Sequence, residues 1–395
     1  MKFTCNQIEF RSAINNISKC LSRNIHTPII SMIYVEADDN EIIFRSTNLE
    51  MIIELQMNAK VDIKGKILLN YENILKIINQ IKGEVLNVEL IDNKLILISE
   101  SNKISLQVQD FEDIPKLPPY TSNISILNIN RSEFIKGVED VLFAVAQSEI
   151  KPEISSLYMY NNENNEIVMV GTDSYRLAEK KIFFKNSKSS HSKIENSEEG
   201  INNSNESLDS DKINILIPKK SIAILLSILN NIKSDEIEIY KYSDGIILST
   251  SNLNIAVKTI NGNYPDYKQL FPKEFKFRIS LNKTELVEVL NMTTVFKDNY
   301  SYSNFKISDN KITIKTQNQM IGSYEGEVNC KIDIFDNEVS IEDLEVNYNS
   351  NYLIEGLSRI QSNLIHIDYT AINRAGFISS GSDNSYKYLI MPLNR

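Results

Sequence analysis

The sequence predicts an α+β fold of three similar domains, each made of two units of one helix and about four strands. Three observations predict this fold: an internal repeat, short alternating strands joined by polar turns, and proline-bearing connectors between the repeats. At 395 residues the chain exceeds one ordinary core, since a domain typically holds ~150 residues. The hydrophobic content of 42% is enough for packed globular domains.

The repeat consists of a short strand, a turn and a helix with apolar spacing. It occurs three times, and aligning Phe10, Phe134 and Leu286 gives periods of 124 and 152 residues. A second helical unit lies inside each period, aligned on Ile74, Ile222 and Leu353. The intervals between the two helical units of each period are 64, 88 and 67 residues.

The middle interval is too long by about two dozen residues, and a polar tract accounts for the surplus. Residues 186–212 consist mainly of Ser, Asn and Glu and hold almost no large apolar side chain. Such a segment buries too little surface to offset its ordering entropy, so we expect a disordered insertion. An inert surface loop is favoured over a binding role.

Strands fill the rest of each unit, as in 41–45, 95–98 and 236–240, and polar turns join them as antiparallel hairpins. Connectors containing proline, at 113–119 and 264–272, separate the long repeats. The predicted domains are 1–120, 121–266 with the insertion 186–212, and 267–395.

Composition excludes most catalytic classes. The three cysteines (Cys5, Cys20 and Cys330) and the three histidines lie far apart in the sequence, so no metal site, cofactor or Ser-His-Asp centre is predicted. Residues 1–6 run directly into an alternating strand and no apolar run reaches ~20 residues, so we expect neither a signal peptide nor a membrane span. A reducing, cytoplasmic setting is expected.

The net charge of −10 argues against nucleic-acid binding unless the charge is segregated. Over the helix spans expected from periodicity the charge sums to +5, which leaves −15 for the remainder. Basic helices beside acidic sheets would attract phosphates without reading sequence, and this permits sliding. Chance and solvated helix faces are the alternative explanation.

The segment 170–178 places a small polar turn between two extended stretches. Locally it indicates a hairpin corner in which Asp173 bonds to backbone N–H groups. A docking surface for a partner peptide is the second interpretation. Catalysis by Asp173 is a third, but no second titratable group stands at a recognisable spacing.

With the repeat, the corner 171–178, the linker Tyr264–Tyr267 and the C-terminal segment Tyr388–Leu393 together, the chain resembles the bacterial DNA polymerase III beta subunit family, the sliding clamps. The resemblance covers the whole chain apart from the insertion. It implies the DNA-clamp fold, in which a head-to-tail homodimer closes into a ring with helices inside and sheets outside.

The resemblance also implies the function. A clamp is non-catalytic, encircles double-stranded DNA without sequence specificity, and tethers a replicative DNA polymerase subunit, repair polymerases and mismatch-repair proteins, while a clamp loader opens it. The alternative is a scaffold of the same fold that binds partner peptides without DNA.

The resemblance places a hydrophobic pocket for partner peptides between the second and third domains. Aliphatic and Met side chains would form an adaptable slot, and Arg176 and Thr172 would fix polar groups of the peptide. Gln269 and Asn394 replace residues that are often basic in relatives, which weakens any preference for acidic flanks. The expected walls are Ile154, Thr172, Tyr175, Arg176, Leu177, Pro265, Leu270, Leu389, Ile390, Met391, Pro392 and Leu393.

For DNA, the candidates carried over from the family lie in loops and at a helix start. Lys219 and Lys220 fall in a first helical turn, where their charge opposes the helix dipole, as expected if they serve a ligand. Glu72 is acidic where relatives are often basic. The expected contacts are Arg23, Asn24, Lys151, Lys219 and Lys220.

For the subunit interface, we expect Ile104 and Leu106 of the first domain to meet Val295 and Phe296 of the third domain. Unpaired strand edges there would need a partner strand.

Overall fold

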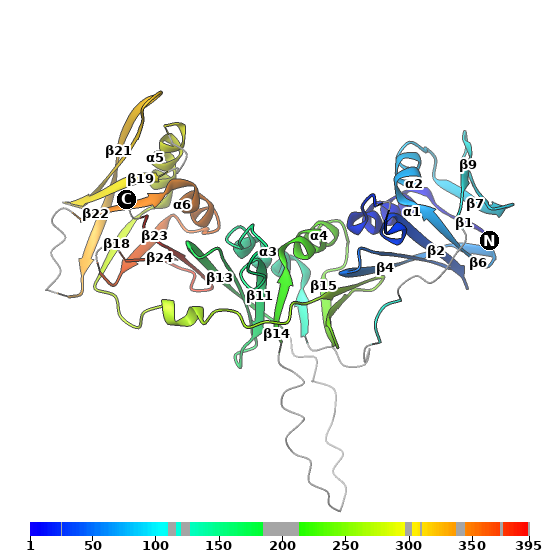
Figure 1. Cartoon of the computed structure of the whole chain (residues 1–395), viewed down its shortest axis with the longest axis horizontal. Coiled ribbons are helices and arrows are strands. Elements are labelled where there is room, and N and C mark those ends of the chain that lie inside the picture. The colour runs from blue at the N-terminus through cyan, green and yellow to red at the C-terminus, as the bar shows by residue number, and fades with distance from the viewer. Residues whose placement is uncertain are drawn as a thin grey trace, which may run out of the picture. The chain divides into compact units, whose positions relative to one another are not determined.

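The structure of the chain is a computed structural model (Figure 1) that describes residues 1–24, 26–109, 116–119, 127–184, 213–296, 302–308, 310–336, 344–371 and 374–393. The predicted insertion 186–212 and Asn394 lie outside these residues. The chain forms two compact units, Met1–Ile135 with Phe184–Thr259 and Lys136–Phe183 with Ile260–Arg395. The three domain boundaries stay a prediction.

Every α-helix in the described residues is preceded by one strand and followed by three, which confirms the repeating helix-plus-four-strand unit. β5 is an addition to this pattern. The elements up to β9 are β1 (Lys2–Asn6), α1 (Gln7–Ile17), η1 (Ser18–Cys20), η2 (Pro28–Ser31), β2 (Met32–Asp38), β3 (Glu41–Thr47), β4 (Met51–Asn58), β5 (Lys60–Ile63), β6 (Gly65–Asn70), α2 (Tyr71–Ile78), β7 (Val85–Ile91), β8 (Lys94–Ile98) and β9 (Lys103–Gln107).

The middle part of the chain repeats this order. Its elements are β10 (Leu127–Asn130), α3 (Arg131–Leu142), β11 (Ser156–Asn161), β12 (Glu166–Thr172), β13 (Arg176–Phe183), β14 (Asn214–Pro218), α4 (Lys219–Leu229), β15 (Glu236–Tyr242), β16 (Gly245–Ser249), β17 (Leu253–Lys258) and η3 (Tyr267–Leu270).

The last part repeats the order once more. Its elements are β18 (Phe277–Asn282), α5 (Lys283–Val295), β19 (Tyr302–Ser308), β20 (Lys311–Asn318), β21 (Gly322–Ile334), β22 (Leu344–Asn349), α6 (Ser350–Leu357), β23 (Leu364–Tyr369), β24 (Gly376–Ser380) and β25 (Tyr386–Ile390).

Antiparallel sheets carry these helices. The first unit holds two sheets, in the orders β5-β1-β7-β8-β9 and β10-β15-β16-β17-β4-β3-β2-β6. In the second unit the strands follow the order β11-β12-β13-β25-β24-β23-β18-β21-β20-β19-β22. Alternate residues of a strand such as β3 are buried, since successive side chains point to opposite faces of a sheet.

Asparagine begins five of the six described helices. The side-chain oxygen of Asn6, for example, accepts the backbone N–H of Ile8 at 2.9 Å and of Glu9 at 3.1 Å. Such a cap satisfies amides that have no partner within the helix. The other capping residues are Asn70, Asn130, Asn282 and Asn349, whereas α4 begins at Pro218 without a side-chain cap.

A shared hydrogen-bonding device joins the two helices of each repeat. The first residue of α1, α3 and α5 donates its side chain to a carbonyl at or just beyond the end of the second helix: Gln7 to Ile81 (3.0 Å), Arg131 to Leu229 (2.8 Å) and Lys283 to Ile360 (2.5 Å). Their backbone N–H groups donate to Glu84, Asp235 and Asn363. The last carbonyls of a helix lack internal partners, so these bonds fix each helix pair.

The aligned apolar positions form the cores on which the helices rest. All six are at most 2% exposed, as the repeat predicts: Phe10, Ile74, Phe134, Ile222, Leu286 and Leu353.

The prediction of basic helices is wrong. α1 and α2 are neutral, α3, α5 and α6 each carry −1 and α4 carries +2, which gives a total of −1. The helices end earlier than periodicity suggested, so Lys19, Arg23, Lys82 and Lys233 follow them. Positive charge therefore lies at the start of α4 and in loops after helices.

Candidate functional site

The turn between β12 and β13 is built by its own side chains. Asp173 Oδ1 accepts the backbone N–H of Tyr175 and of Arg176, each at 3.0 Å. Thr172 Oγ1 donates to the Arg176 carbonyl at 2.6 Å, and Ser174 occupies the left-handed region with φ of 76°. The prediction that Asp173 shapes a hairpin corner is confirmed.

The strand below the corner lies directly against the end of α3. A Cβ on Gly171 would lie 2.5 Å from the Val141 carbonyl oxygen, so this position excludes any larger residue. The N–H of Ala146 points to the carbonyls of both Ile154 and Thr172, at 3.1 Å each. These bonds bring Ile154, a predicted wall residue, beside the corner.

The C-terminal segment is bonded to the same corner. β13 pairs with β25 so that Leu177 lies opposite Leu389. Beyond β25, the Met391 N–H donates to the Tyr175 carbonyl at 2.8 Å and the Leu393 N–H donates to the Asn347 carbonyl at 2.8 Å. The structure thus brings together two segments that are more than 200 residues apart in the sequence.

Arg176 is 8% exposed and binds groups of the chain itself. Its guanidinium donates to Asp173 Oδ2 at 3.0 Å, to Glu355 and to the Phe143 carbonyl at 2.9 Å, and it lies 4.0 Å from the centre of the Tyr352 ring. Burial lowers the pKa of Arg176, but the hydrogen bond to Glu355 and the nearby anions raise it more, so the net direction is upward.

Polar atoms of Arg176 and Thr172 bind groups within the corner. Their predicted contact with polar groups of a peptide stays a prediction. Phe143, Tyr352 and Glu355 are not among the site residues predicted from the sequence. Their only local signal is the spacing of Tyr352 and Glu355, which places them on one face of α6.

The linker lies on an aromatic cluster that covers the face of β13 and β25 to which Leu177 and Leu389 point. Leu177 and Leu389 pack there with Tyr267 and Phe377. The Tyr267 hydroxyl donates to Glu179 at 2.7 Å and lies 2.9 Å from the Tyr160 hydroxyl. Burial, and then the charge of Glu179, raise the pKa of Tyr267, so it stays a neutral donor.

The twelve predicted wall residues differ in exposure. Tyr175 (57%), Leu270 (52%) and Met391 (40%) are exposed, as is Pro265, and Leu393 is half-buried. We call these five residues the corner surface. Ile154, Thr172 and Pro392 are also half-buried, whereas Arg176, Leu177, Leu389 and Ile390 are buried.

Ile390 differs most from the prediction. It lines an internal space with Leu286 and Tyr348, on the opposite side of β25 from Leu389. Adjacent residues of a strand face opposite sides, so the two cannot share one wall.

A second apolar surface lies where α5 meets β21, which runs beside α5 in Figure 1. We call Met292, Val295, Phe296, Ile321 and Tyr324 the α5–β21 patch. Val295 is 57% and Ile321 59% exposed, and the rings of Phe296 and Tyr324 stack with centroids 6.1 Å apart. The patch contains both predicted interface residues of the third domain and adds three that the sequence reasoning missed.

The backbone edges near the predicted interface residues are open. β9 pairs with β8 and with no other described strand, and it carries the half-buried Ile104 and Leu106. β21 pairs with β20 over Gly322–Asn329 and with β18 over Cys330–Ile334. Its first half therefore has one side without a described strand partner.

The predicted DNA contacts lie in both units. Arg23, Asn24, Lys219 and Lys220 belong to the first unit, and Lys151 belongs to the second. Arg23, Lys151 and Lys220 are exposed, whereas Lys219 is half-buried.

Asn24 shapes its own loop, since its Oδ1 accepts the N–H groups of His26 at 2.8 Å and Thr27 at 3.0 Å. Glu72 stands in the first turn of α2, where it complements the helix dipole.

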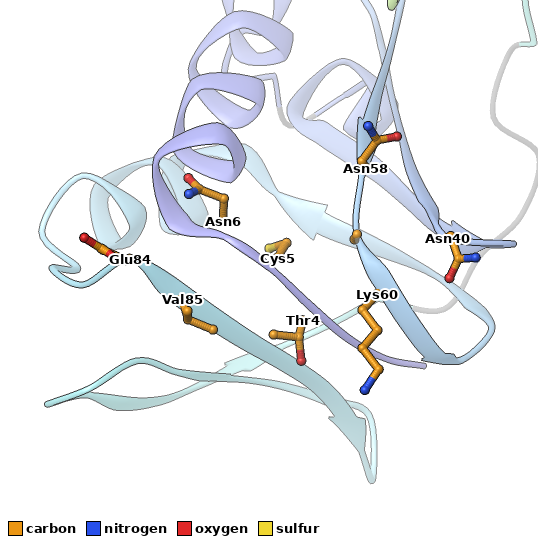
Figure 2. A pocket seen from close by; sticks show the side chains of 9 residues that line it. Thr4, Cys5, Asn6, Asn40, Asn58, Lys60, Glu84 and Val85 are labelled. Atoms are coloured by element: carbon orange, nitrogen blue, oxygen red, sulfur yellow. The ribbon is translucent and has the colours of Figure 1, made fainter.

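Two recesses lie apart from the corner surface. One, of about 680 Å³, lies along β1 and is lined there by Thr4, Cys5 and Asn6 (Figure 2). Glu84 and Val85 line it on one side of β1, and Asn40, Asn58 and Lys60 line it on the other. The other, of about 860 Å³, is lined by Glu274, Phe275, Lys276, Phe335, Asp336 and Thr370.

The first recess contains a thiol, that of Cys5. Burial raises the pKa of the Cys5 thiol to about 12, so it is not a nucleophile near neutral pH. No group of three His, Cys, Asp or Glu in the described part of the chain could hold a metal ion. No helix there is long and apolar enough to cross a membrane.

Comparison with known proteins identifies the family. The chain matches the DNA polymerase III beta subunit over its N-terminal domain (residues 1–118), central domain (128–195) and C-terminal domain (268–394). The beta sliding clamps of Staphylococcus epidermidis and Staphylococcus aureus are each 23% identical, and the alignments cover 100% of this chain and 99% of the relative.

Solved structures show the same fold. The DNA polymerase sliding clamp of Bacillus subtilis aligns with a TM-score of 0.86 at 19% identity, over 100% of this chain and 99% of that one. The beta subunit of Thermotoga maritima aligns with a TM-score of 0.85 at 20% identity, over 100% and 99%. The predicted fold class is confirmed.

Proposed function

Because the chain belongs to the DNA polymerase III beta subunit family, the bacterial sliding clamps, we propose that two copies close head to tail into a ring around double-stranded DNA. As a member of this family the chain is a non-catalytic accessory subunit of a DNA polymerase. The observation that carries the ring proposal is the pair of unlike uncovered surfaces, β9 and the α5–β21 patch.

Each copy has one of each surface, so two copies can form two equivalent contacts. Such unlike contacts close into a ring when the rotation between copies allows it. Ile104 and Leu106 of one copy would cover Val295 and Phe296 of the other, and the open sides of β9 and β21 would pair. An open strand edge is otherwise a site of uncontrolled association.

DNA would be held through its phosphates. Arg23 and Lys220 present exposed cations in the first unit and Lys151 does so in the second, with Asn24 and Lys219 beside the first two. Contacts to phosphate carry no sequence information, so the ring could slide along the duplex.

The corner surface would receive short apolar segments of partner proteins. Its exposed side chains are aromatic, aliphatic and thioether groups, which adapt to several ligands. The partners would be a replicative DNA polymerase subunit, the clamp loader, repair polymerases and mismatch-repair proteins, all in the cytoplasm.

Retention on DNA of different topology tests the ring. The protein is loaded onto nicked circular DNA with a clamp loader, one half of the sample is linearised with a restriction enzyme, and both halves are passed over a sizing column. A ring of two 45.2 kDa chains stays on the circle and is lost from the linear form. Equal retention on both forms would contradict encirclement.

A clamp-fold scaffold that binds partners without DNA is the second candidate. The total helix charge of −1 favours it, since basic helices are not available to hold phosphates. The variant Lys219→Gln/Lys220→Gln decides between them. A DNA clamp becomes less retained on circles and loses about two units of its log–log salt slope, whereas a scaffold shows no DNA retention to lose.

A further inference from the structure

We propose that the corner surface selects partner segments that carry a lysine or arginine beside their apolar side chains. This rests on the proposed function, because it names the chemistry of the segment that the corner surface would bind. It follows from the ion pair at the corner, where the carboxylate of Glu355 is half-exposed and the guanidinium of Arg176 is buried.

The positive charge of Arg176 is neutralised by carboxylates of the same chain. Two carboxylates, Asp173 and Glu355, contact the guanidinium, and the Phe143 carbonyl occupies a further N–H. The Arg176 side chain is only 9% exposed, whereas that of Glu355 is 48% exposed. A partner approaching the corner therefore meets the carboxylate of Glu355 rather than the guanidinium.

Other charged groups lie around Lys180. Lys180 Nζ lies 3.7 Å from Asp140 and from Asp383, Lys136 also acts electrostatically on both carboxylates, and Arg359 stands over the Phe143 ring at 5.6 Å. The groups in direct contact with the guanidinium are Asp173 and Glu355, and together with Arg176 they carry a net charge of −1.

The cations nearest the linker end of the corner surface, Lys268 and Lys387, lie on the other face of β13 from Glu355. Gln269 is neutral and its Nε2 donates to Asp266 at 2.8 Å. Lys268 lies 4.8 Å from the Tyr160 ring centre and Lys387 lies 5.5 Å from that of Phe271. Those rings cover the face of β13 to which Leu177 points, and the adjacent Arg176 points to the opposite face.

Three peptides of nine residues test the preference. They share a central Leu-Ala-Leu-Phe segment and carry lysine, glutamine or aspartate on both sides, with blocked ends. Dissociation constants are measured by fluorescence anisotropy at low salt for the full chain, for Glu355→Gln, and for Glu288→Gln. The last variant removes an exposed acid on α5 and controls for the net charge of −10.

The lysine peptide should bind about threefold to fivefold more tightly than the aspartate peptide, the size expected of a partly exposed charge pair. Glu355→Gln should abolish the difference, and Glu288→Gln should retain it. Equal affinities, or a difference that survives Glu355→Gln, would overturn this proposal while peptide binding itself would stand. Failure of all three peptides to bind would overturn the docking function as well.

Discussion

The second unit carries two apolar surfaces of similar exposure, the corner surface and the α5–β21 patch, and their backbones differ. At the corner, β13 is paired on both sides, with β12 and β25, and Asp173, Thr172 and Arg176 fix the turn. At the patch, the first half of β21 pairs with β20 alone among the described strands.

This difference indicates what each surface can bind. A surface whose strands are already paired on both sides binds a partner mainly through side chains, so it can serve several short segments in turn. An open strand edge offers a row of N–H and C=O groups, so it suits one partner strand of fixed register. We therefore propose that the corner serves many partners and that the patch serves a second copy of the chain.

Removing the Arg176 guanidinium from the corner should have the largest effect of these substitutions, and it should act on the free energy of unfolding. Arg176→Met leaves Asp173 Oδ2 and the Phe143 carbonyl without the guanidinium donor and Glu355 without its cation, so the free energy of unfolding should fall by about 3 kcal/mol. Urea unfolding measures it, and amide exchange in β13 and β25 should accelerate. Lys331→Met, which breaks an exposed ion pair with Asp333, should cost less than about 1 kcal/mol. Equal losses of unfolding free energy in the two variants would show that Arg176 does not stabilise the corner.

A charge in the patch should break the dimer and leave the corner intact. Val295→Asp buries a carboxylate in the interface, so dimerisation should weaken by about 2–3 kcal/mol. Sedimentation velocity at micromolar concentration measures it, with Ile150→Asp, at an apolar residue outside the patch that is 88% exposed, as the control. An unchanged dimer would refute the assignment of the patch.

A charge at the corner should weaken peptide binding and leave the dimer intact. Met391→Asp should weaken binding of the glutamine peptide by about 1–2 kcal/mol, because an apolar contact is lost and a charge is desolvated. The dimer should persist, since the Met391 side chain lies outside the patch. Anisotropy and sedimentation on one sample separate the two effects. Loss of both would mean that the surfaces are not independent.

The smallest expected effect comes from relieving the left-handed backbone at Ser174 in the turn. Ser174→Gly removes the cost of a left-handed serine, so the free energy of unfolding should rise by ~0.5 kcal/mol. Ser251→Gly, at an exposed serine without positive φ, should lower it by a similar amount. Thermal unfolding compares them, and a loss in both variants would show that the corner stores no backbone strain.

Local patterns in the sequence predict much of this fold. The six aligned apolar positions are all buried, and the turn at Asp173 has the predicted side-chain-to-backbone bonds. Strand alternation would also have separated Leu389 from Ile390, although the family resemblance placed both in one wall. Helix ends were less predictable. The expected helix spans were too long and included basic residues that follow the helices, so the expected helix charge was too positive.

Long-range pairing could not be predicted. Arg176 meets Glu355 across 179 residues of sequence, and nothing in either segment indicates the partner. Such a contact depends on how β13, β25 and α6 pack, whereas turns and caps depend on a few adjacent residues. The charge balance of the corner therefore becomes visible only in the structure.

Native mass spectrometry of the chain with excess glutamine peptide tests the separation of the two surfaces most directly. We expect a dimer of 45.2 kDa chains with two bound peptides, and a Val295→Asp monomer with one. A dimer that binds a single peptide, or a monomer that binds none, would contradict it, because peptide binding would then depend on the interface between copies.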